Sequence, residues 1–208
     1  MSHYEKEYDN LDWCTWIEQN ILTGKVRFNN RWGEPFEDWT TTKLKDIVTC
    51  TNSKHDLHDV DTLPAHGGKY PLYTSSGLYK MVPYYDQEEP YIGINLRGSP
   101  GNVFIYHACS SMNSTHAYLN LKEGNDWDLR FVYFQVCQIH WNKYIQGTTI
   151  KGMNFKDFKN ELILTPELEE QYRIGNFIQA GSDKYHELEE KIYLMKLFKK
   201  GLLQRLFI

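Results

Sequence analysis

Hydrophobic and polar residues follow three different patterns along the chain. The first pattern is a helical spacing of apolar side chains before Gly24, which stands where a helix is expected to stop. It predicts a short amphipathic helix over residues 10–22, whose apolar positions are Trp13, Trp16, Ile17 and Ile21. A polar connector with turn-forming residues and Pro35 follows this helix.

The second pattern occupies residues 43–163, where short apolar or aromatic runs alternate with clusters of Gly, Pro, Ser and Asn. Runs of this length between breakers predict strands and turns, and together they predict the globular body. For residues 126–140, periodicity does not decide between a strand and a buried helix.

The third pattern begins at Pro166, after which no proline occurs. Residues 166–180 suit a helix with Pro166 at its first position and acidic residues in its first turn. A second helical stretch is predicted to begin with Ser182 or Asp183 as its N-cap. Its apolar seam alternates in steps of three and four residues, is interrupted by Lys199 at one inward position, and consists of Tyr185, Leu188, Ile192, Met195, Leu202 and Leu206.

Further apolar residues widen this stripe beyond a strict coiled-coil seam, namely Leu194, Leu197, Phe198 and Leu203. A small domain cannot cover so long a helix, so we expect a good part of the stripe to face a helix of another chain. The alternative is packing against the chain's own body, together with the N-terminal helix.

Composition limits the possible functions without selecting one. The 208 residues suit one domain and an extended element, and the net charge of −4 disfavours a protein that binds DNA by its overall charge. It does not exclude DNA binding, because local phosphate contacts determine affinity. Without a signal peptide pattern or a membrane-length apolar run, the chain is expected in the cytoplasm. The four cysteines predict free buried thiols: Cys14, Cys50, Cys109 and Cys137.

Candidate catalytic and metal-binding motifs are weak. The stretch from His55 to Asp61 contains ligand-type residues (His55, Asp56, His58, Asp59 and Asp61), but it lacks a second cluster and fits a solvated loop better. Gly98 and Gly101 do not have the spacing of a phosphate-binding loop, and a tight turn between strands explains them. We therefore expect a chain without catalytic residues, bound metal or cofactor of its own.

Three segments near the C-terminus carry a resemblance. They are GTTIKGMNFKDFKN at 147–160, TPELEEQYRIGNFI at 165–178 and KIYLMKLFKKGLLQRLF at 191–207. In this order and spacing they resemble the end of one repeat of the specificity (S) subunits of type I restriction–modification systems. Segments 27–47, 69–78 and 94–105 are similar to earlier parts of the same repeat.

The resemblance implies an α+β fold in three parts: an N-terminal helix and junction at 1–26, a target recognition domain at 27–164, and a helical spacer at 165–208. Family members carry two recognition domains and two long helices that pack antiparallel, whereas this chain has one of each. It therefore resembles a half-length subunit, expected to form an antiparallel, coiled-coil-like homodimer that reads one half of a bipartite DNA target with each copy. Expected partners are double-stranded DNA, a methyltransferase subunit that binds S-adenosylmethionine, and a restriction subunit.

On this interpretation, loops of the body contact base edges in the major groove. The candidates lie around two glycine turns and in the basic segment beyond them: Ser75, Ser76, Tyr79, Lys80, Arg97, Asn102, Lys143, Lys151 and Lys156. The three last lysines are expected to contact phosphates, which position the protein without specifying sequence. The alternative function is a protein-interaction module derived from such a subunit that no longer reads DNA.

Overall fold

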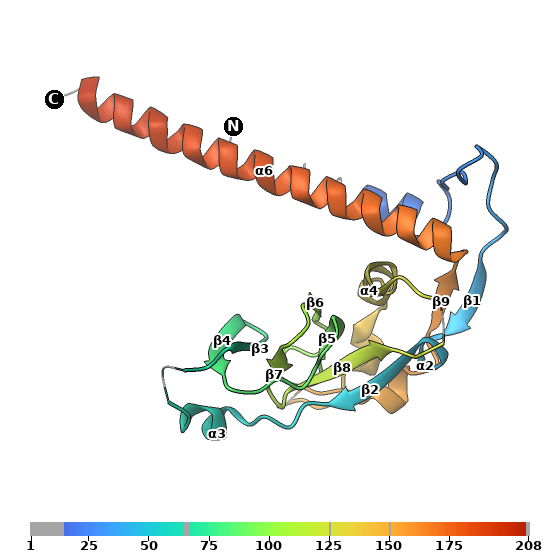
Figure 1. Ribbon diagram of the computed structural model, residues 1–208, viewed down its shortest axis with the longest axis horizontal. Coiled ribbons are helices and arrows are strands. Elements are labelled where there is room, and N and C mark those ends of the chain that lie inside the picture. The colour runs from blue at the N-terminus through green and yellow to red at the C-terminus, as the bar shows by residue number, and fades with distance from the viewer. Residues whose placement is uncertain (1–14, 65–66, 125, 150, 207–208) are drawn as a thin grey trace.

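The computed structural model describes residues 15–64, 67–124, 126–149 and 151–206. It has a mixed α/β body and one long C-terminal helix that leaves the body at an angle (Figure 1). The order of elements along the chain is η1 (Ile17–Ile21), β1 (Thr40–Lys43), α2 (Leu44–Ile47), β2 (Val48–Asn52), α3 (Leu57–Asp61), β3 (Tyr70–Thr74), β4 (Gly77–Val82), β5 (Tyr91–Asn95), β6 (Val103–Tyr106), β7 (Ser111–Met112), β8 (His116–Leu121), α4 (Leu129–Cys137), η2 (Trp141–Tyr144), α5 (Phe155–Phe158), β9 (Leu162–Thr165) and α6 (Leu168–Leu206).

Three small sheets build the body. The four-stranded sheet has the order β2-β8-β5-β6, with antiparallel neighbours throughout. The three-stranded sheet has the order β4-β3-β7, in which β3 pairs antiparallel with β4 and parallel with β7. β1 and β9 form an antiparallel pair from Thr40↔Thr165 to Lys43↔Leu162, so the segments that lead into and out of the body lie side by side.

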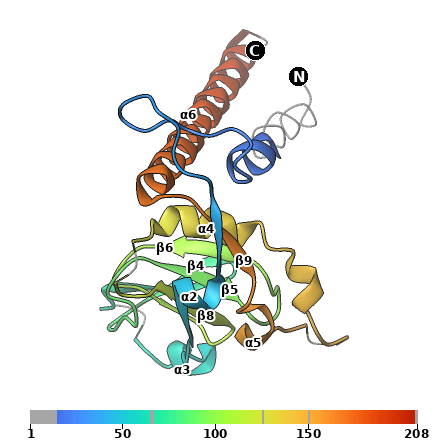
Figure 2. The same ribbon diagram turned by 90° about the vertical axis from the view of Figure 1, so that its right-hand side faces the viewer.

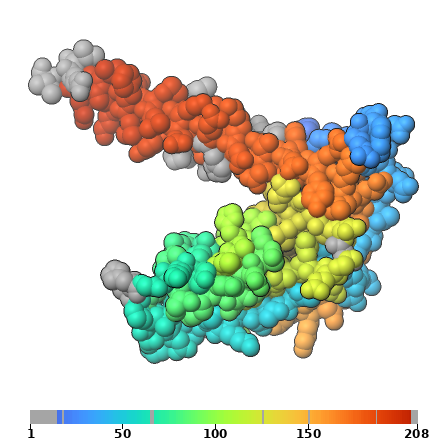
Figure 3. Space-filling view, viewed as in Figure 1, coloured from blue at the N-terminus to red at the C-terminus, as the bar shows by residue number. Residues whose placement is uncertain are grey.

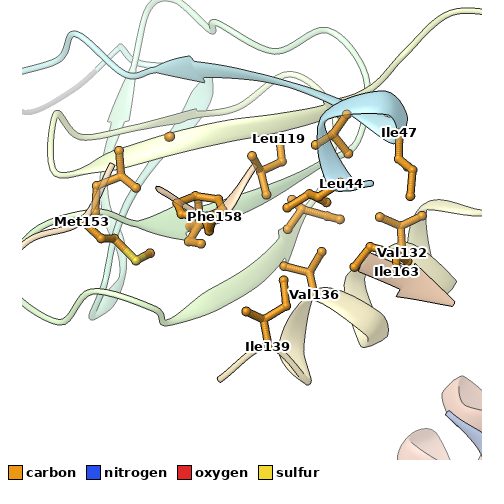
Figure 4. Packing of buried hydrophobic residues seen from close by; sticks show 14 residues of the cluster. Leu44, Ile47, Leu119, Val132, Val136, Ile139, Met153, Phe158 and Ile163 are labelled. Carbon is orange, nitrogen blue, oxygen red and sulfur yellow. The ribbon is translucent and has the colours of Figure 1, made fainter. Parts of the chain in front are cut away.

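The main core lies on the face of the four-stranded sheet that α4 covers (Figure 4). Val132 and Val136 of α4 pack there with Leu119 of β8, and Phe158 of α5 closes the core. The opposite face of the sheet packs on β3 and β7 through an aromatic cluster around Met112. Both faces are therefore covered, which explains why all five residues of β5 are buried.

The segment 126–140, for which the sequence left strand and helix open, forms the helix α4. Asp128 is its N-cap and accepts a hydrogen bond from the Phe131 backbone N at 2.9 Å. Of the amphipathic helix predicted over residues 10–22, residues 10–14, including Trp13, lie outside the described residues. The described part is the π-helical turn η1, whose Ile17 and Ile21 are buried, and Gly24 has a φ of +72°.

α6 corrects the expectation of two helical stretches. It continues through Ser182 and Asp183 without interruption, so neither residue caps a helix. Asp183 instead accepts a hydrogen bond from Gln179 Nε2 at 2.8 Å along the helix surface. The helix begins at Leu168, two residues after the predicted Pro166.

Ion pairing and packing fix the N-terminal part of α6 to the body. Glu170 is fully buried and accepts hydrogen bonds from Arg27 Nε at 3.1 Å, Arg27 Nη2 at 2.8 Å and Trp39 Nε1 at 2.7 Å. Ile174 and Ile178 pack with Phe131 of α4. Past Ile178 the helix projects away from the body, and the space-filling view shows an open wedge between the two (Figure 3).

Two further expectations need correction. The segment around His55 was predicted to be a solvated loop, but it forms the short helix α3 with Asp56 as N-cap, and His55 is half-buried against Tyr84. The cysteines Cys50, Cys109 and Cys137 form no disulfide, yet none is fully buried and Cys137 is exposed. Cys14 lies outside the described residues. No helix among the described residues is long and apolar enough to cross a membrane.

Candidate nucleic-acid interface

The first predicted turn is the tip of the β3–β4 hairpin. Ser75 and Ser76 are both exposed there, between Thr74 and Gly77. The Thr74 hydroxyl accepts a hydrogen bond from the Ser76 backbone N at 3.3 Å, and Gly77 adopts a φ of +104°. The turn thus presents two hydroxyl groups from a defined backbone conformation.

The two candidates just beyond this turn are engaged within the protein. The Tyr79 hydroxyl donates a hydrogen bond to Asp61 at 2.7 Å, and this bond raises the pKa of Tyr79. The Lys80 ammonium donates to the backbone oxygens of Val60 at 3.0 Å and Leu63 at 2.7 Å, at the end of α3. Both side chains therefore hold α3 against β4, and the structure gives Lys80 a role inside the fold.

The second predicted turn connects β5 and β6. Arg97 and Asn102 are exposed at its two ends, and Gly98 and Gly101 have φ values of +79° and +91°. A Cβ at Gly101 would lie 2.6 Å from the Cβ of Trp141, so only glycine fits this close approach. The prediction of a tight glycine turn between two strands is confirmed.

Lys151 is brought next to this second turn by backbone pairing. Gln146 and Gly152 exchange two backbone hydrogen bonds of 2.8 and 2.9 Å, and Gly152 forms an isolated antiparallel bridge with Arg97. The Met153 backbone N then donates to Leu96 O at 3.0 Å. The exposed side chains of Arg97 and Lys151 therefore leave neighbouring segments, although 54 positions separate them in the sequence.

The other two lysines differ in their surroundings. Lys143 is paired with Glu161 at 2.5 Å and lies 4.9 Å from the centre of the Tyr144 ring. Lys156 is exposed on α5. Glu161 is half-buried and also accepts a hydrogen bond from the Tyr144 hydroxyl, so Lys143 is engaged within the fold and its phosphate contact stays a prediction.

A short polar segment joins the two turns. The Asn113 backbone N donates to Tyr73 O at 3.0 Å near the first turn, and Thr115 O accepts from the backbone N of Leu96 at 2.8 Å and of Arg97 at 3.2 Å. Ser114, between them, is exposed. Both turns thus border one end of the body, and Ser114 joins the candidates. Sequence analysis missed it, because a serine in a short polar run carries no pattern of its own.

Beneath this end lies a row of buried polar side chains. Asn95 of β5 and His116 of β8 are register partners and are fully buried. Neither side-chain atom of Asn95 has a hydrogen-bond partner among the described residues, nor does Nε2 of His116. Burial lowers the pKa of His116 to about 4, so its imidazole is neutral at neutral pH.

Acidic side chains gather on another side of the first turn. Asp59 of α3 and Asp86 both contribute to the raised pKa of Tyr84, whose largest cause is burial. Asp86 also lies 2.9 Å from His55 Nε2 and accepts a hydrogen bond from the Tyr118 hydroxyl at 2.6 Å. These acids would repel phosphates, whereas Arg97, Lys151 and Lys156 would attract them. In the described part of the chain, no three His, Cys, Asp or Glu residues are grouped as a metal site.

The predicted seam of α6 is a separate surface. Leu188, Met195 and Leu202 are 47%, 62% and 42% exposed, while Ile192 and Tyr185 are half-buried. Leu206 lies in the last turn of the helix, and its side chain is outside the described ones. The additional apolar residues Leu194, Leu197, Phe198 and Leu203 are also exposed. In the described structure the body leaves most of this stripe uncovered.

The sequence and the fold of this chain are similar to those of known proteins. The sequence profile of the type I restriction modification DNA specificity domain matches residues 36–194. No curated protein sequence matches significantly. Among solved structures, the S subunit of a type I restriction-modification system from M. genitalium is 19% identical, with a TM-score of 0.64 over 80% of this chain and 43% of that one.

Two other structures are similar over 90% of this chain. One, described as concerning complex assembly and conformational transition of the type I R-M system, is 14% identical with a TM-score of 0.63. The HsdS subunit from Thermoanaerobacter tengcongensis is 13% identical with a TM-score of 0.53. In both cases 49% of the other chain is covered, so this chain spans about half the length of the structures it matches.

Proposed function

This chain belongs to the family of type I restriction modification DNA specificity domains, and on that premise we propose that its body reads the base sequence of double-stranded DNA. The reading surface is the end of the body that carries Ser75 and Ser76, Ser114, and Arg97 with Asn102. Hydroxyl, amide and guanidinium groups are suited to the donor and acceptor pattern of base edges in the major groove.

The observation that carries this proposal is the backbone bridge between Arg97 and Gly152, which brings the segment that contains Lys151 beside the second turn. It concentrates positive charge beside the polar turns in a chain whose net charge is −4. Arg97 can donate two parallel hydrogen bonds to a guanine edge, and Lys151 and Lys156 can neutralise phosphates. Acidic residues around α3 would orient the DNA toward the basic side.

We further propose that the chain acts as the non-catalytic recognition part of a larger complex. A methyltransferase subunit would bind S-adenosylmethionine and modify the DNA, and a restriction subunit would join the cleaving form. The family membership and the likeness to S subunits support this assignment. The protruding part of α6 and its exposed apolar residues offer a docking surface for such a subunit.

The decisive experiment combines the chain with its cognate methyltransferase subunit and S-adenosylmethionine on a plasmid library of random sequence. Mapping the methylated bases should give one defined recognition sequence. Arg97→Ala should relax the base preference at one position, because a bidentate contact discriminates by about 1–3 kcal/mol. Lys69→Ala is the matched control, since Lys69 is exposed at the opposite end of β3. Absence of methylation would favour a protein-interaction module without DNA reading.

We also propose that two copies pair through α6 in antiparallel orientation, so that each reads one half of a bipartite target. The charge distribution of the helix supports this orientation. Residues 168–190 carry six acidic and two basic side chains, a net charge of −4, whereas residues 191–206 carry five basic and no acidic side chains. Antiparallel pairing sets the acidic half of one helix against the basic half of the other, and parallel pairing would set like charges together.

The mass of the chain in solution tests this pairing. Sedimentation equilibrium should give twice 24.7 kDa. Ile192→Asp should give the monomer, because a carboxylate in the middle of the seam would be buried without a partner. Ile192→Leu, which keeps the apolar side chain, should remain dimeric. A wild-type chain that stays monomeric at all concentrations would contradict the proposal.

A further inference from the structure

The first turn carries one exposed leucine beside its serines. Leu78 is the second residue of β4 and is 59% exposed. Ser75 and Ser76 lie at the tip of the same hairpin, and Gly77 separates them from Leu78. This end of the body therefore presents an apolar side chain as well as hydroxyl groups.

An inserted residue in β4 decides which way Leu78 points. Leu72 of β3 pairs with Lys80 of β4. The next residue of β3, Tyr73, pairs with Leu78, which leaves Tyr79 as an extra residue in β4. Such a β-bulge redirects the side chains beyond it. Because residues directly opposite each other share a face of the sheet, Leu78 lies on the face that carries Tyr73.

The two faces of this sheet have different surroundings. On one face, Val82 of β4 packs with Val60 of α3. On the other face, the Tyr73 ring stacks on the Tyr106 ring, with 4.5 Å between their centres. Regular alternation from Val82 along β4 would place Leu78 on the α3 face. The bulge therefore turns Leu78 away from α3.

Contacts with α3 hold the bulge in this conformation. The hydroxyl of Tyr79, the inserted residue, donates to Asp61 at 2.7 Å, and the Lys80 ammonium donates to Val60 O at 3.0 Å. These bonds fix β4 next to Leu78, which reduces the entropy lost when a ligand covers the leucine. Exposed leucines are common on protein surfaces. One that a fixed bulge turns outward beside a binding turn is suited to a specific contact.

The base edges of DNA offer one apolar group to such a side chain. In the major groove the bases present hydrogen-bond donors and acceptors, and thymine adds a C5-methyl group. A serine hydroxyl both donates and accepts, so Ser75 and Ser76 alone would distinguish the bases weakly. A leucine contact would add a preference for thymine over the other bases.

We propose that Leu78 contacts the C5-methyl group of a thymine in the major groove. The recognition sequence then has an A·T pair at this position, with the methyl group of its thymine against the leucine. This inference rests on the proposed reading of DNA and deepens it, because it names the base that the first turn selects.

Thymine and uracil differ by this methyl group alone, which allows a direct test. Once the recognition sequence is mapped, each thymine in a duplex that carries it is replaced in turn by uracil. Fluorescence anisotropy then measures binding of the duplex to the complex of the chain with its methyltransferase subunit. Uracil at one position should weaken binding to the wild type about 4-fold, the loss expected for one buried methyl group. Leu78→Ser should bind the thymine and uracil duplexes equally.

Matched variants separate the methyl contact from a general loss of apolar surface. Leu78→Met keeps an apolar side chain at the turn and should keep the preference for thymine. Leu162→Ser should keep it as well, although Leu162 is 60% exposed, because this leucine belongs to the β1–β9 pair. Figure 2 shows this pair below α6, and in Figure 1 it lies at the opposite end of the body from β4.

The outcomes separate this inference from the proposed function. Failure to obtain any defined recognition sequence would overturn both. A defined sequence that tolerates uracil at every thymine, or a uracil penalty that persists in Leu78→Ser, would overturn the leucine contact and leave DNA reading intact. If Leu78→Ser instead weakens binding of the methyltransferase subunit without DNA, that subunit covers Leu78 and the inference is wrong.

Discussion

Asn95 and His116 are buried polar neighbours, and three of their side-chain polar atoms have no hydrogen-bond partner among the residues that the structure describes. Their position on β5 and β8 places them directly behind the turn that carries Arg97. Because burial disfavours the imidazolium, the folded protein keeps His116 neutral down to a pKa of about 4, against 6.5 for an exposed histidine. The unfolded chain thus binds a proton that the folded chain does not.

This difference predicts a loss of stability in acid. As the pH falls from 7 to 5, protonation of the unfolded state should remove about 2 kcal/mol from the free energy of unfolding. Urea unfolding at both pH values measures it, with His116→Gln as the variant that cannot titrate. The wild type should lose more stability than the variant over this range. Equal losses would show that His116 does not cause the effect.

The second turn requires glycine at position 101, where there is no room for a Cβ atom. The φ of +91° at Gly101 and the 2.6 Å between an added Cβ and Trp141 both oppose any side chain. Gly101→Ala should reduce the free energy of unfolding by about 2 kcal/mol, as measured by urea unfolding. Gly98→Ala is the informative comparison, because Gly98 also has positive φ but no atom within 4 Å of an added Cβ. A similar loss in both variants would assign the cost to φ alone.

At the scale of elements, the ion pair between Arg27 and the buried Glu170 supports the join between α6 and the body, together with the packing of Ile174 and Ile178. Hydrogen bonds to Glu170 hold the pKa of Arg27 above its ordinary value. Among the described residues, Arg27→Ala would leave the fully buried Glu170 with Trp39 as its one side-chain donor, and should cost about 3 kcal/mol of stability by thermal or urea unfolding. Lys184→Ala removes the exposed pair with Glu187 and should cost less than about 1 kcal/mol. Comparable effects would contradict a structural role for the buried pair.

The charges along α6 predict whether two copies of the helix pair in antiparallel or parallel orientation. Lys199→Glu with Lys200→Glu should weaken dimerisation, since it sets acidic residues against the acidic half of the partner helix. Adding 0.5 M salt should reduce the difference from the wild type, because salt screens exposed charges. Lys199→Gln with Lys200→Gln serves as the neutral control. A dimer strengthened by the acidic substitutions would indicate parallel pairing.

At the scale of the whole molecule, the two proposed tasks, DNA reading and pairing of copies, belong to different parts: the body and α6. The body carries the proposed reading surface at one end, and α6 extends from the other side and carries the apolar stripe (Figure 1). The β1–β9 pair and the Arg27–Glu170 pair join them. This rigid join would let the length of α6 set the distance between two recognition domains.

DNA affinity should then depend on salt through a few local contacts. In the complex with the methyltransferase subunit, Lys151→Ala should weaken binding about equally for all sequences and reduce the slope of log affinity against log salt by about 1. Fluorescence anisotropy of labelled duplex DNA at several salt concentrations measures both quantities. Lys69→Ala should leave the slope unchanged. An unchanged slope in Lys151→Ala would remove this residue from the interface.

The sequence by itself determined the family, the strands around the glycine turns and the helical nature of the C-terminal segment. These features depend on local spacing: Gly98 and Gly101 break the chain, and apolar residues repeat every three or four positions after Pro166. Only the tertiary structure decided what each side chain contacts. It paired Arg97 with Gly152, the neighbour of Lys151, engaged Lys80 with the end of α3, and continued α6 through Ser182. Such pairings depend on how distant segments pack together, and spacing along the chain does not encode them locally.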